Sequence, residues 1–376
     1  MTPLGIYVHV PFCASRCGYC DFNTYTAKEL GSGVDRAGFH HQLNMEIEQA
    51  AQALGDRAVS TVFVGGGTPT LVGADALLGI LEAIRRNFDL AADAEVTTEA
   101  NPDSVDQAML DALRAGGYTR ISFGMQSAAP HVLAVLERTH TPGSALRVAQ
   151  WAREAGFENI NIDLIYGTPG ETDEDLRASL DEVLAAEVDH VSAYSLIVED
   201  GTALGRRVAR GELPAPDDDV CADRYEIVDD TLTAAGLPWY EVSNWARPGS
   251  ECRHNIGYWN NTDWWGVGPG AHSHLAGERW WNVKHPARYA EAITAGRSPR
   301  DAGEDLSPDQ RATEAVMLGI RTRYGVALGD RGSRAESLVH EGLLDPDAFA
   351  RGRAALTRQG RLLTNRVVRV LLDHQG

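Results

Sequence analysis

Three cysteines lie close together near the start of the chain, in the spacing C-x3-C-x2-C. They are Cys13, Cys17 and Cys20. Three thiols cannot all pair as disulfides, whereas soft thiolate ligands select zinc, copper(I) or an iron–sulfur cluster. A closed structural zinc site and a cubane cluster held wholly by protein each need four ligands. The motif supplies three, so we expect one coordination position of the metal to remain open for a substrate or cofactor.

The main alternative for this motif is a structural zinc knuckle whose fourth ligand is His9. Zinc knuckles normally carry complete ligand sets in paired motifs. No second cysteine pair with that spacing occurs in the sequence. The residues therefore favour a cluster over a zinc site.

The cysteine loop resembles the cluster loop of the radical S-adenosylmethionine (SAM) superfamily. It directly follows a predicted first strand, Gly5–Val10, and an aromatic residue, Tyr19, precedes the last cysteine. The resemblance implies a [4Fe-4S] cluster held by the three cysteines. It also implies that SAM chelates the fourth iron through its amino and carboxylate groups, with Tyr19 near the adenine.

A glycine-rich run, Gly65-Gly66-Gly67-Thr68-Pro69, follows the second predicted strand, Thr61–Val64. Glycine lacks a Cβ, so the backbone of such a loop can approach a ligand closely. No Lys-Ser/Thr follows, which excludes a phosphate-binding loop of the P-loop type. In the superfamily that the chain resembles, this loop holds the amino group of SAM. The resemblance therefore assigns Gly66, Gly67 and Thr68 to SAM binding.

Further polar residues occupy the ends of later predicted strands or the loops after them. SAM carries a sulfonium, an ammonium and a carboxylate, so its site needs carboxylates, an amide and an arginine. Resemblance to the coproporphyrinogen-oxidase-like branch of the superfamily implies further SAM contacts at four such residues, Glu99, Gln126, Arg138 and Asp163. It implies contacts also at Tyr7, in the first predicted strand, and at the apolar Ile197, in the sixth. Any one of them alone is compatible with an ordinary solvated strand-end residue. Together, at successive strand ends, they favour a cofactor site.

A second conspicuous region is rich in tryptophan, with seven of the eight tryptophans between Trp239 and Trp281. It contains the motif His254-Asn255-x-x-Tyr258-Trp259, followed by the glycine-rich run 266–273. These motifs resemble the signature of HemW-type heme chaperones, which bind heme and hand it to acceptor proteins. Heme iron is commonly held by an axial histidine, and the resemblance implies His254. The alternative is that the tryptophans pack the open side of a barrel and His254 is a core histidine with satisfied hydrogen bonds.

Strand-like and helix-like segments alternate through the first 200 residues. Strands are predicted at Gly5–Val10, Thr61–Val64, Glu95–Glu99, Arg120–Phe123, Asn159–Tyr166 and His190–Val198. Helices are predicted at Phe39–Leu54, Ala74–Phe88, after an N-cap at Ser104, and at His131–Leu136, Ser144–Ala155 and Thr172–Ala186. Six β-α repeats predict a parallel sheet with helices outside. They are too few to close an eight-stranded barrel, so we expect a partial (β/α)6 barrel with its site at the C-terminal strand ends.

Composition divides the chain into three predicted parts. Residues 1–200 form the partial barrel, 201–300 an accessory Trp/His-rich region, and 301–376 a small winged-helix-like domain. The accessory region is predicted to begin with a helix at Val220–Ala235. The last part is predicted to contain a helix at Pro346–Arg358 and a hairpin near Leu362–Leu372.

The net charge and the hydropathy of the sequence indicate which classes of partner the protein is not expected to bind. The formal net charge is −19, and residues 300–376 are nearly neutral with 12 arginines and 11 acidic residues. Nucleic acid is therefore not expected as a partner, because phosphate backbones require basic faces. No apolar stretch approaches the ~20 residues of a membrane span, and the short apolar run 6–10 is not a signal peptide. Five cysteines without a disulfide pattern fit a reducing compartment, so we expect a cytoplasmic protein.

Two functions compete at this point. The first is a heme chaperone that binds a [4Fe-4S] cluster, SAM and heme and delivers heme to unidentified acceptor proteins, with a homodimer as a candidate assembly. The second is an oxygen-independent coproporphyrinogen III oxidase of porphyrin biosynthesis. That enzyme carries a further cysteine where this chain has Phe22, and an N-terminal extension, whereas this chain starts six residues before Tyr7. Both differences favour the chaperone. A zinc-bearing interaction module would explain neither the glycine loop nor the strand-end polar residues.

Overall fold

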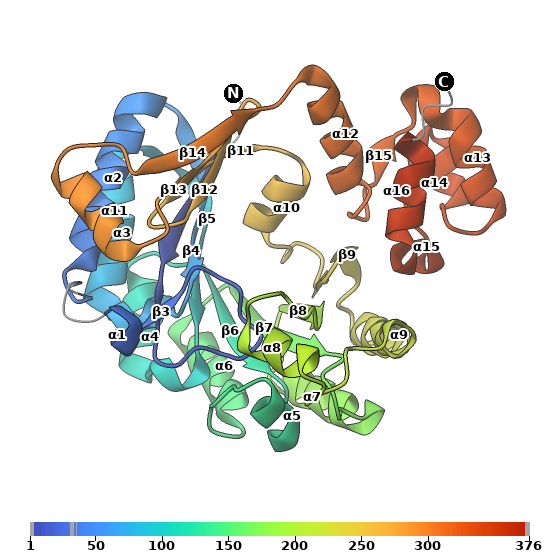
Figure 1. Ribbon diagram of the computed structural model, residues 1–376, viewed down its shortest axis with the longest axis horizontal. Coiled ribbons are helices and arrows are strands. Elements are labelled where there is room, and N and C mark those ends of the chain that lie inside the picture. The colour runs from blue at the N-terminus through green and yellow to red at the C-terminus, as the bar shows by residue number, and fades with distance from the viewer. Residues whose placement is uncertain (1–3, 31–33, 35, 373–376) are drawn as a thin grey trace.

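The computed structural model describes residues 4–30, 34 and 36–372 and is built around a 12-stranded sheet. Six parallel strands form the centre of this sheet and are paired in chain order (Figure 1). They are β1 (Leu4–Val10), β4 (Ala58–Gly66), β5 (Asp89–Ala100), β6 (Arg120–Gln126), β7 (Asn159–Tyr166) and β8 (His190–Ser195). The predicted parallel sheet of six β-α repeats is confirmed.

Helices follow the central strands and cover the outer face of the sheet (Figure 1). Their bounds are α1 (Ala27–Leu30), α2 (Phe39–Leu54), α3 (Ala74–Asn87), α4 (Gln107–Ala115), α5 (Pro130–Val135), α6 (Ser144–Ala155) and α7 (Asp173–Ala185). In α3, Leu77, Ile80 and Ile84 recur at helical spacing and are fully buried. Burial of each such side chain contributes about 1.5–3 kcal/mol to folding. This apolar stripe holds α3 against the strands.

Two boundaries near the C-terminal strand ends differ from prediction. The N-cap of α4 is Asp106, whose side chain accepts a hydrogen bond from the Met109 amide, and not Ser104. Ser104 lies in the 3-10 turn Pro102–Ser104, where its hydroxyl donates to the Asn101 carbonyl. Strand β8 ends at Ser195 rather than Val198. The residues after Ser195 are therefore loop residues.

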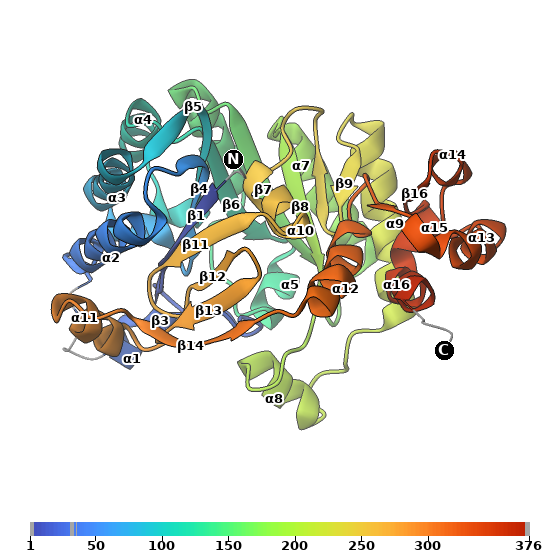
Figure 2. The same cartoon turned by 90° about the horizontal axis from the view of Figure 1, so that it is seen from above.

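The Trp-rich region extends both edges of the sheet (Figure 2). Strand β11 (Asp263–Val267) pairs parallel to β1, and the antiparallel strands β12 (His272–Leu275), β13 (Glu278–Asn282) and β14 (Arg300–Asp305) follow. At the other edge, β10 (Asn244–Ala246) and β9 (Trp239–Glu241) extend the sheet beyond β8. The helices of this region are α8 (Ala203–Ala209), α9 (Asp218–Ala234), α10 (Arg253–Trp259) and α11 (Pro286–Thr294). The domain boundaries at residues 200 and 300 stay a prediction.

The C-terminal residues form an apolar cluster of their own around Ile320, Leu338 and Val367. The elements are α12 (Pro308–Gly319), β15 (Val326–Ala327), α13 (Gly332–His340), α14 (Pro346–Ala350), β16 (Arg353–Ala354), α15 (Arg358–Leu362) and α16 (Thr364–Leu372). Two sequence predictions were wrong here. The helix expected to reach Arg358 ends at Ala350, and the segment expected to form a hairpin is α16. The pairing strands of this region are β15 and β16.

Candidate functional site: a cofactor cavity at the strand ends

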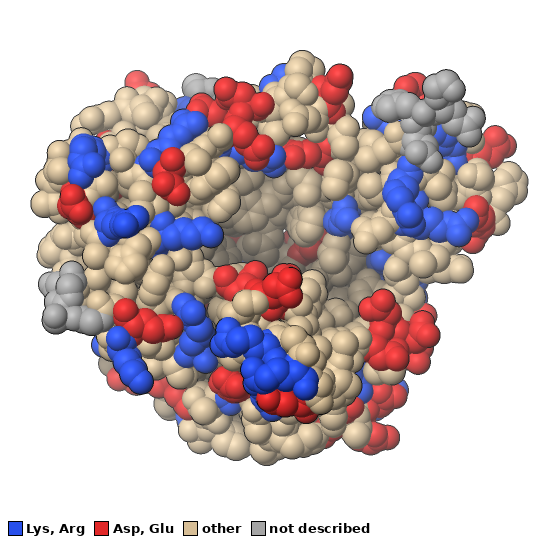
Figure 3. All heavy atoms as spheres, in the orientation of Figure 1, with Lys and Arg blue, Asp and Glu red and all other residues tan. Residues whose placement is uncertain are grey.

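A cavity of about 670 Å³ opens at the C-terminal ends of the parallel strands. Its walls come from the loop after β1, from the C-terminal parts of β4, β5, β6, β7 and β8, and from segments that follow β4, β5, β6 and β8. Figure 3 shows the molecule hollowed at the centre of the face seen in Figure 1. Of the residues predicted for the cofactor site, the cavity is lined by Cys13, Cys17, Tyr19, Cys20, Gly66, Gly67, Thr68, Glu99, Gln126, Arg138, Asp163 and Ile197.

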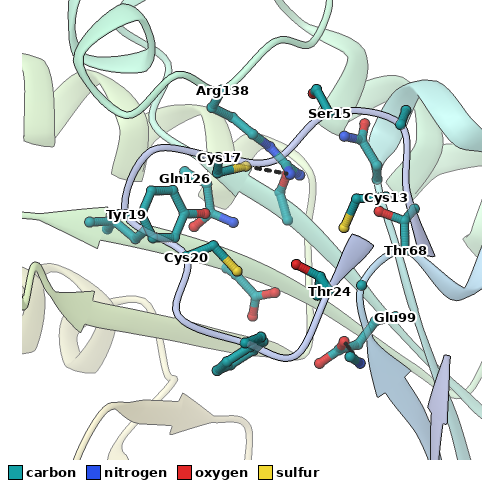
Figure 4. A pocket seen from close by; sticks show the side chains of 18 of the residues that line it. Cys13, Ser15, Cys17, Tyr19, Cys20, Thr24, Thr68, Glu99, Gln126 and Arg138 are labelled. Atoms are coloured by element: carbon teal, nitrogen blue, oxygen red, sulfur yellow. Dashed lines mark hydrogen bonds between the residues drawn. The ribbon is translucent and has the colours of Figure 1, made fainter. Parts of the chain in front are cut away.

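The loop after β1 presents three free thiols to this cavity, and Figure 4 shows their sulfur atoms pointing into a common space. The Gly18 amide, within the loop, donates to the Leu136 carbonyl at 2.9 Å, which fixes the loop to the neighbouring wall. Burial, followed by the nearby Cys20, raises the pKa of Cys13 to about 11. This thiol therefore stays protonated at neutral pH until a metal displaces its proton.

The spacing of the thiols bears on which metal group they suit. Among the described residues, no three His, Cys, Asp or Glu side chains stand close enough together to hold one metal ion. In a cubane cluster each cysteine ligates a different iron, so the ligands form a wider triangle. The zinc alternative also lacks its fourth ligand, because His9 is buried and both its ring nitrogens are engaged. They lie 2.9 Å from the Tyr7 hydroxyl and 2.9 Å from the Asn23 carbonyl oxygen.

The glycine-rich loop lies directly against the cysteine loop. A Cβ on Gly67 would lie 2.5 Å from the Phe12 carbonyl oxygen, and Gly66 has a φ of 113°, a conformation that side chains rarely adopt. The amides of Gly67 and Thr68 donate to the carbonyls of Val10 and Phe12 at 2.8 and 2.7 Å. Because these N–H groups already have protein partners, a ligand at this loop would meet its carbonyl oxygens and the Thr68 hydroxyl. Such acceptors suit an ammonium group.

Two of the carboxyl groups that line this cavity, those of Glu99 and Asp163, lie on the parallel strands β5 and β7. Glu99 accepts a hydrogen bond from the Gly66 amide at 3.0 Å. Burial, followed by the charge of Asp163, raises the pKa of Glu99 to about 8. Burial also raises the pKa of Asp163, although Ser122 and Asn161 donate hydrogen bonds to it at 3.1 and 2.7 Å. Two neighbouring carboxyls, neither of them in an ion pair with a described residue, form a site that a positively charged ligand would stabilise.

Arg138 is the one basic residue among the described residues that line the cavity. Its Nη1 donates to the Cys17 sulfur at 3.6 Å and its Nη2 to the Gly124 carbonyl at 2.6 Å, while its buried Nε has no hydrogen-bond partner (Figure 4). The neighbouring Gln126 has a φ of 72°, a left-handed conformation that costs free energy in a residue with a side chain. The guanidinium of Arg138 can therefore receive the carboxylate of a zwitterion.

Tyr7 and Tyr19 differ in position. Tyr19 lines the cavity, and burial, followed by Cys17, raises its pKa. Tyr7 lies on the inner face of β1 outside the cavity lining, with its hydroxyl bonded to His9. Sequence reasoning missed several lining residues, including Thr24, Asn101 and Tyr194. The available signal was position, because Asn101 directly follows β5 and Tyr194 is near the end of β8.

His254 lies outside the cofactor cavity, on helix α10, beside a smaller cavity of about 240 Å³. Its Nδ1 is 2.8 Å from the Thr61 hydroxyl and its Nε2 is 2.8 Å from the Tyr258 hydroxyl. Burial lowers the pKa of His254 to about 4. These contacts are those of a satisfied core histidine. Heme ligation by His254 stays a prediction that these contacts do not favour.

Comparison of the sequence with known proteins places this site in a family. The model of the radical SAM superfamily matches residues 7–183. The chain is 54% identical to the heme chaperone HemW of Mycobacterium tuberculosis H37Rv, over 98% of this chain and 95% of that protein. It is 33% identical to the heme chaperone HemW of Escherichia coli K12, over 99% of both chains. It is 37% identical to the mitochondrial radical S-adenosyl methionine domain-containing protein 1 of the mouse, over 87% of this chain and 70% of that protein.

Among solved structures, the chain is similar to coproporphyrinogen III oxidase (HemN) from E. coli, a radical SAM enzyme. The two superpose with a TM-score of 0.84 at 25% sequence identity. The match covers 98% of this chain and 90% of that protein, so it includes the extended sheet and the C-terminal helices as well as the partial barrel.

Proposed function

This chain belongs to the HemW-type proteins of the radical SAM superfamily, and we propose that it is a heme chaperone that binds heme and delivers it to acceptor proteins. The observation that carries this proposal is the 54% identity to a heme chaperone over 98% of the chain. A similarity of that extent includes the Trp-rich region and the C-terminal helices as well as the superfamily core, which ends at residue 183 in the family match.

Membership of the superfamily implies a [4Fe-4S] cluster and SAM. We assign the cluster to Cys13, Cys17 and Cys20, because no fourth cysteine and no histidine lines the cavity among the described residues. When bound and reduced, such a cluster supplies an electron to the sulfonium of SAM.

The charged groups of the cavity support a matching assignment for SAM. The ammonium and sulfonium would lie towards Glu99, Asp163 and the carbonyls of Gly66 and Gly67, and the carboxylate towards Arg138. Thr68, Gln126, Tyr19 and Ile197 complete the wall. Tyr7 would act through His9 and the glycine loop, since a Cβ on Gly66 would lie 2.5 Å from the His9 ring.

The second candidate function is coproporphyrinogen III oxidation, favoured by the similarity in fold to the E. coli oxidase. Phe22 argues against it, because the oxidase pattern has a cysteine at that place. The Phe22 side chain lines the cavity and is 61% exposed, so it adds an apolar group beside the cluster site and no ligand.

The remaining proposals concern location and assembly. Among the described helices, none is both long and apolar enough to cross a membrane. We place the protein in the cytoplasm, where free thiols stay reduced. With a net charge of −19, we expect that it does not bind nucleic acid. A homodimer remains a candidate assembly.

The proposed function is tested on the full chain, reconstituted with iron and sulfide without oxygen. We expect about four irons per chain, a Soret absorbance on addition of ferric heme, and loss of that absorbance when an apo-acceptor takes up the heme. With SAM and a reductant, we expect no protoporphyrinogen from coproporphyrinogen III.

The controls separate the two functions. The E. coli oxidase serves as the positive control for decarboxylation, and a Cys17→Ser variant should lose the cluster while keeping its melting temperature. If the chain decarboxylates coproporphyrinogen III as fast as the oxidase does, the proposal of a chaperone is wrong and the chain is an oxidase. If the chain binds no heme, the proposed function is wrong.

A further inference from the structure

One open face of the sheet carries aromatic rings and imidazoles side by side. We call it the His272 face and define it by Trp264, His272, His274, Arg279 and Trp281. Residue pairing places His272 opposite Trp281, and His274 opposite both Trp264 and Arg279, across strands β11, β12 and β13 (Figure 2). Residues that pair directly project from the same side of a sheet, so the five side chains share one face.

The other face of the same strands is already covered. Trp265 and Trp280 project there and meet edge to face, with 4.9 Å between their ring centroids. Trp265 and Leu275 pack against the main apolar core. The His272 face instead continues the inner face of the barrel, since Trp264 contacts Tyr258 of α10 with 4.7 Å between ring centroids. It is therefore the side of these strands left for a ligand.

His272 differs from the other histidines of the inner face. The side chains of His9, His190, His254 and His274 each hydrogen-bond to protein groups. The His272 side chain is exposed and forms no hydrogen bond with the described residues. Its ring stacks on Trp281 at a centroid distance of 5.5 Å and an interplanar angle of 28°. An imidazole held by stacking, with both nitrogens open, is prepared to bind a metal ion.

We propose that His272, and not His254, is the axial ligand of the heme iron, and that the heme lies on the His272 face. This inference rests on the proposed function, because it names the place where the cargo of the chaperone binds. Trp264 and Trp281 supply aromatic surface for the macrocycle, and His272 supplies a nitrogen for the iron.

A lysine at the edge of this face can pair with one propionate of heme. Lys284 follows β13, is exposed, and forms no ion pair with the described residues. It lies close enough to His272 for its charge to act on the imidazole. Arg279 is not free, because Glu304 and Glu314 accept its hydrogen bonds at 2.8 Å.

The position of this face also suits a protein that carries both a cluster and heme. The loop that leads into β12 packs on His9, since a Cβ on Gly268 would lie 2.4 Å from the His9 carbonyl oxygen, and a Cβ on Gly66 of the SAM-binding loop would lie 2.5 Å from the His9 ring. His254 offers none of these features. Binding iron there would require breaking the hydrogen bond to Thr61 or to Tyr258 inside a buried site.

The test titrates the cluster-loaded full chain with two probes, ferric heme and metal-free protoporphyrin IX. Loss of an iron ligand should weaken heme binding by the His272→Ala variant roughly tenfold or more and shift its Soret band. Binding of protoporphyrin IX, which has no iron to ligate, should change little in the same variant. A Trp281→Leu variant should bind both probes more weakly, because the substitution removes aromatic surface from the site.

Two further variants make the assignment specific. Imidazole added to His272→Gly should restore the Soret position of the wild-type complex. The matched His254→Ala variant should keep the wild-type heme spectrum, while its melting temperature falls through the loss of two buried hydrogen bonds. Cluster content and melting temperature, measured for every variant, identify any that fails to fold.

The contrary results are distinct. If His272→Ala binds heme with the wild-type affinity and spectrum, or if His254→Ala alone loses the Soret band, His272 is not the ligand and only this inference is overturned. If the wild-type chain binds no heme, the proposed function fails, and this inference with it.

Discussion

In Glu99 and Asp163, burial disfavours the ionised carboxylate that a cationic ligand would require. Both carboxyls reach the cofactor cavity, from β5 and β7, and neither forms an ion pair with a described residue, although the charge of Arg138 acts on Asp163. Burial and the charge of Asp163 raise the pKa of Glu99 to about 8, above an unfolded value of about 4.3. Between these values the folded chain keeps a proton that the unfolded chain has lost. The contribution of Glu99 to stability is therefore complete below about pH 4 and is lost as the pH rises towards 8.

This conflict predicts a pH-dependent affinity for SAM. A cationic ligand favours the ionised carboxylate, so binding near neutral pH should release a proton, and affinity should rise with pH. We expect SAM to bind cluster-loaded protein about tenfold more tightly at about pH 8.5 than at about pH 6.5. Anaerobic equilibrium dialysis measures the affinity. In a Glu99→Gln variant the dependence should be largely lost; a variant as pH-dependent as the wild type would show that another group takes up the proton.

For single residues, the sequence predicts which chemistry a side chain can perform better than it predicts which residues that side chain contacts. The cysteine spacing predicts a metal group because thiolates so close together have few other uses. All three cysteines and nearly all the predicted SAM residues do line one cavity. The state of His254 could not be predicted, because it depends on Thr61, a partner 193 residues away in the chain. Residue type alone left heme ligand and core histidine equally open.

At the scale of elements, the cofactor cavity depends on the contact between two loops. The glycine loop after β4 packs against the cysteine loop after β1 through Gly67, whose Cα faces the Phe12 carbonyl. The two loops also share the hydrogen bonds from Gly67 to Val10 and from Thr68 to Phe12. Any side chain at residue 67 would force the loops apart. The position of the thiols is thus set partly by a residue that has no side chain.

Gly67→Ala should accordingly destabilise the protein by about 1–3 kcal/mol, since it overpacks a tight contact with backbone. It should also lower the iron content after reconstitution. Denaturant unfolding and iron analysis measure the two effects. The matched control is Gly79→Ala in α3, where the nearest atom to the new Cβ is 3.7 Å away. Alanine favours a helix by about 1 kcal/mol over glycine, so this control should keep its cluster and full stability. Equal behaviour of the two variants would contradict the packing argument.

The bounds of helices and strands could be predicted where the spacing of apolar residues and the residues that end an element indicated the same limits. The bounds of α2, α6 and β7 match those expected from the sequence. Helix α16 was missed because its run 366–372 is rich in valine, which favours strands in isolation. In the folded chain, Val367, Val368 and Leu371 are buried at helical spacing against the C-terminal cluster. Tertiary packing decided the structure of this segment.

At the scale of the whole molecule, the sheet contains more strands than the six that the β-α repeats predict. Strand β11 joins β1 in parallel, with Leu4 opposite Asp263, and brings β12 to β14 and the His272 face beside the cofactor cavity. No local pattern specifies a partner so distant in the sequence. The buried carboxyl of Glu46 on α2 helps to hold this extension. It accepts hydrogen bonds from Gly268, Asn282 and Tyr289 at 2.6, 2.6 and 2.5 Å.

The C-terminal helices are joined to the sheet layer by a buried ion pair. Asp229 of α9 accepts two hydrogen bonds from Arg361 of α15, at 2.9 and 2.7 Å. The same carboxylate accepts a third hydrogen bond from the Trp245 indole at 2.9 Å. The Arg361 guanidinium also lies 4.6 Å from the ring centroid of Trp239. Removal of one member would leave the other charge buried and unpaired.

Asp229→Ala should therefore cost about 3 kcal/mol and loosen α12–α16 from the rest of the chain. Thermal denaturation measures the stability, and limited proteolysis reports the release of the C-terminal helices. The adjacent Asp230→Ala is the matched control. Asp230 pairs with Arg358 at 2.7 Å, but its side chain is 70% exposed, so solvent screens the pair and the loss should be small. If the two variants melt alike, the C-terminal helices are held by apolar contact rather than by this pair.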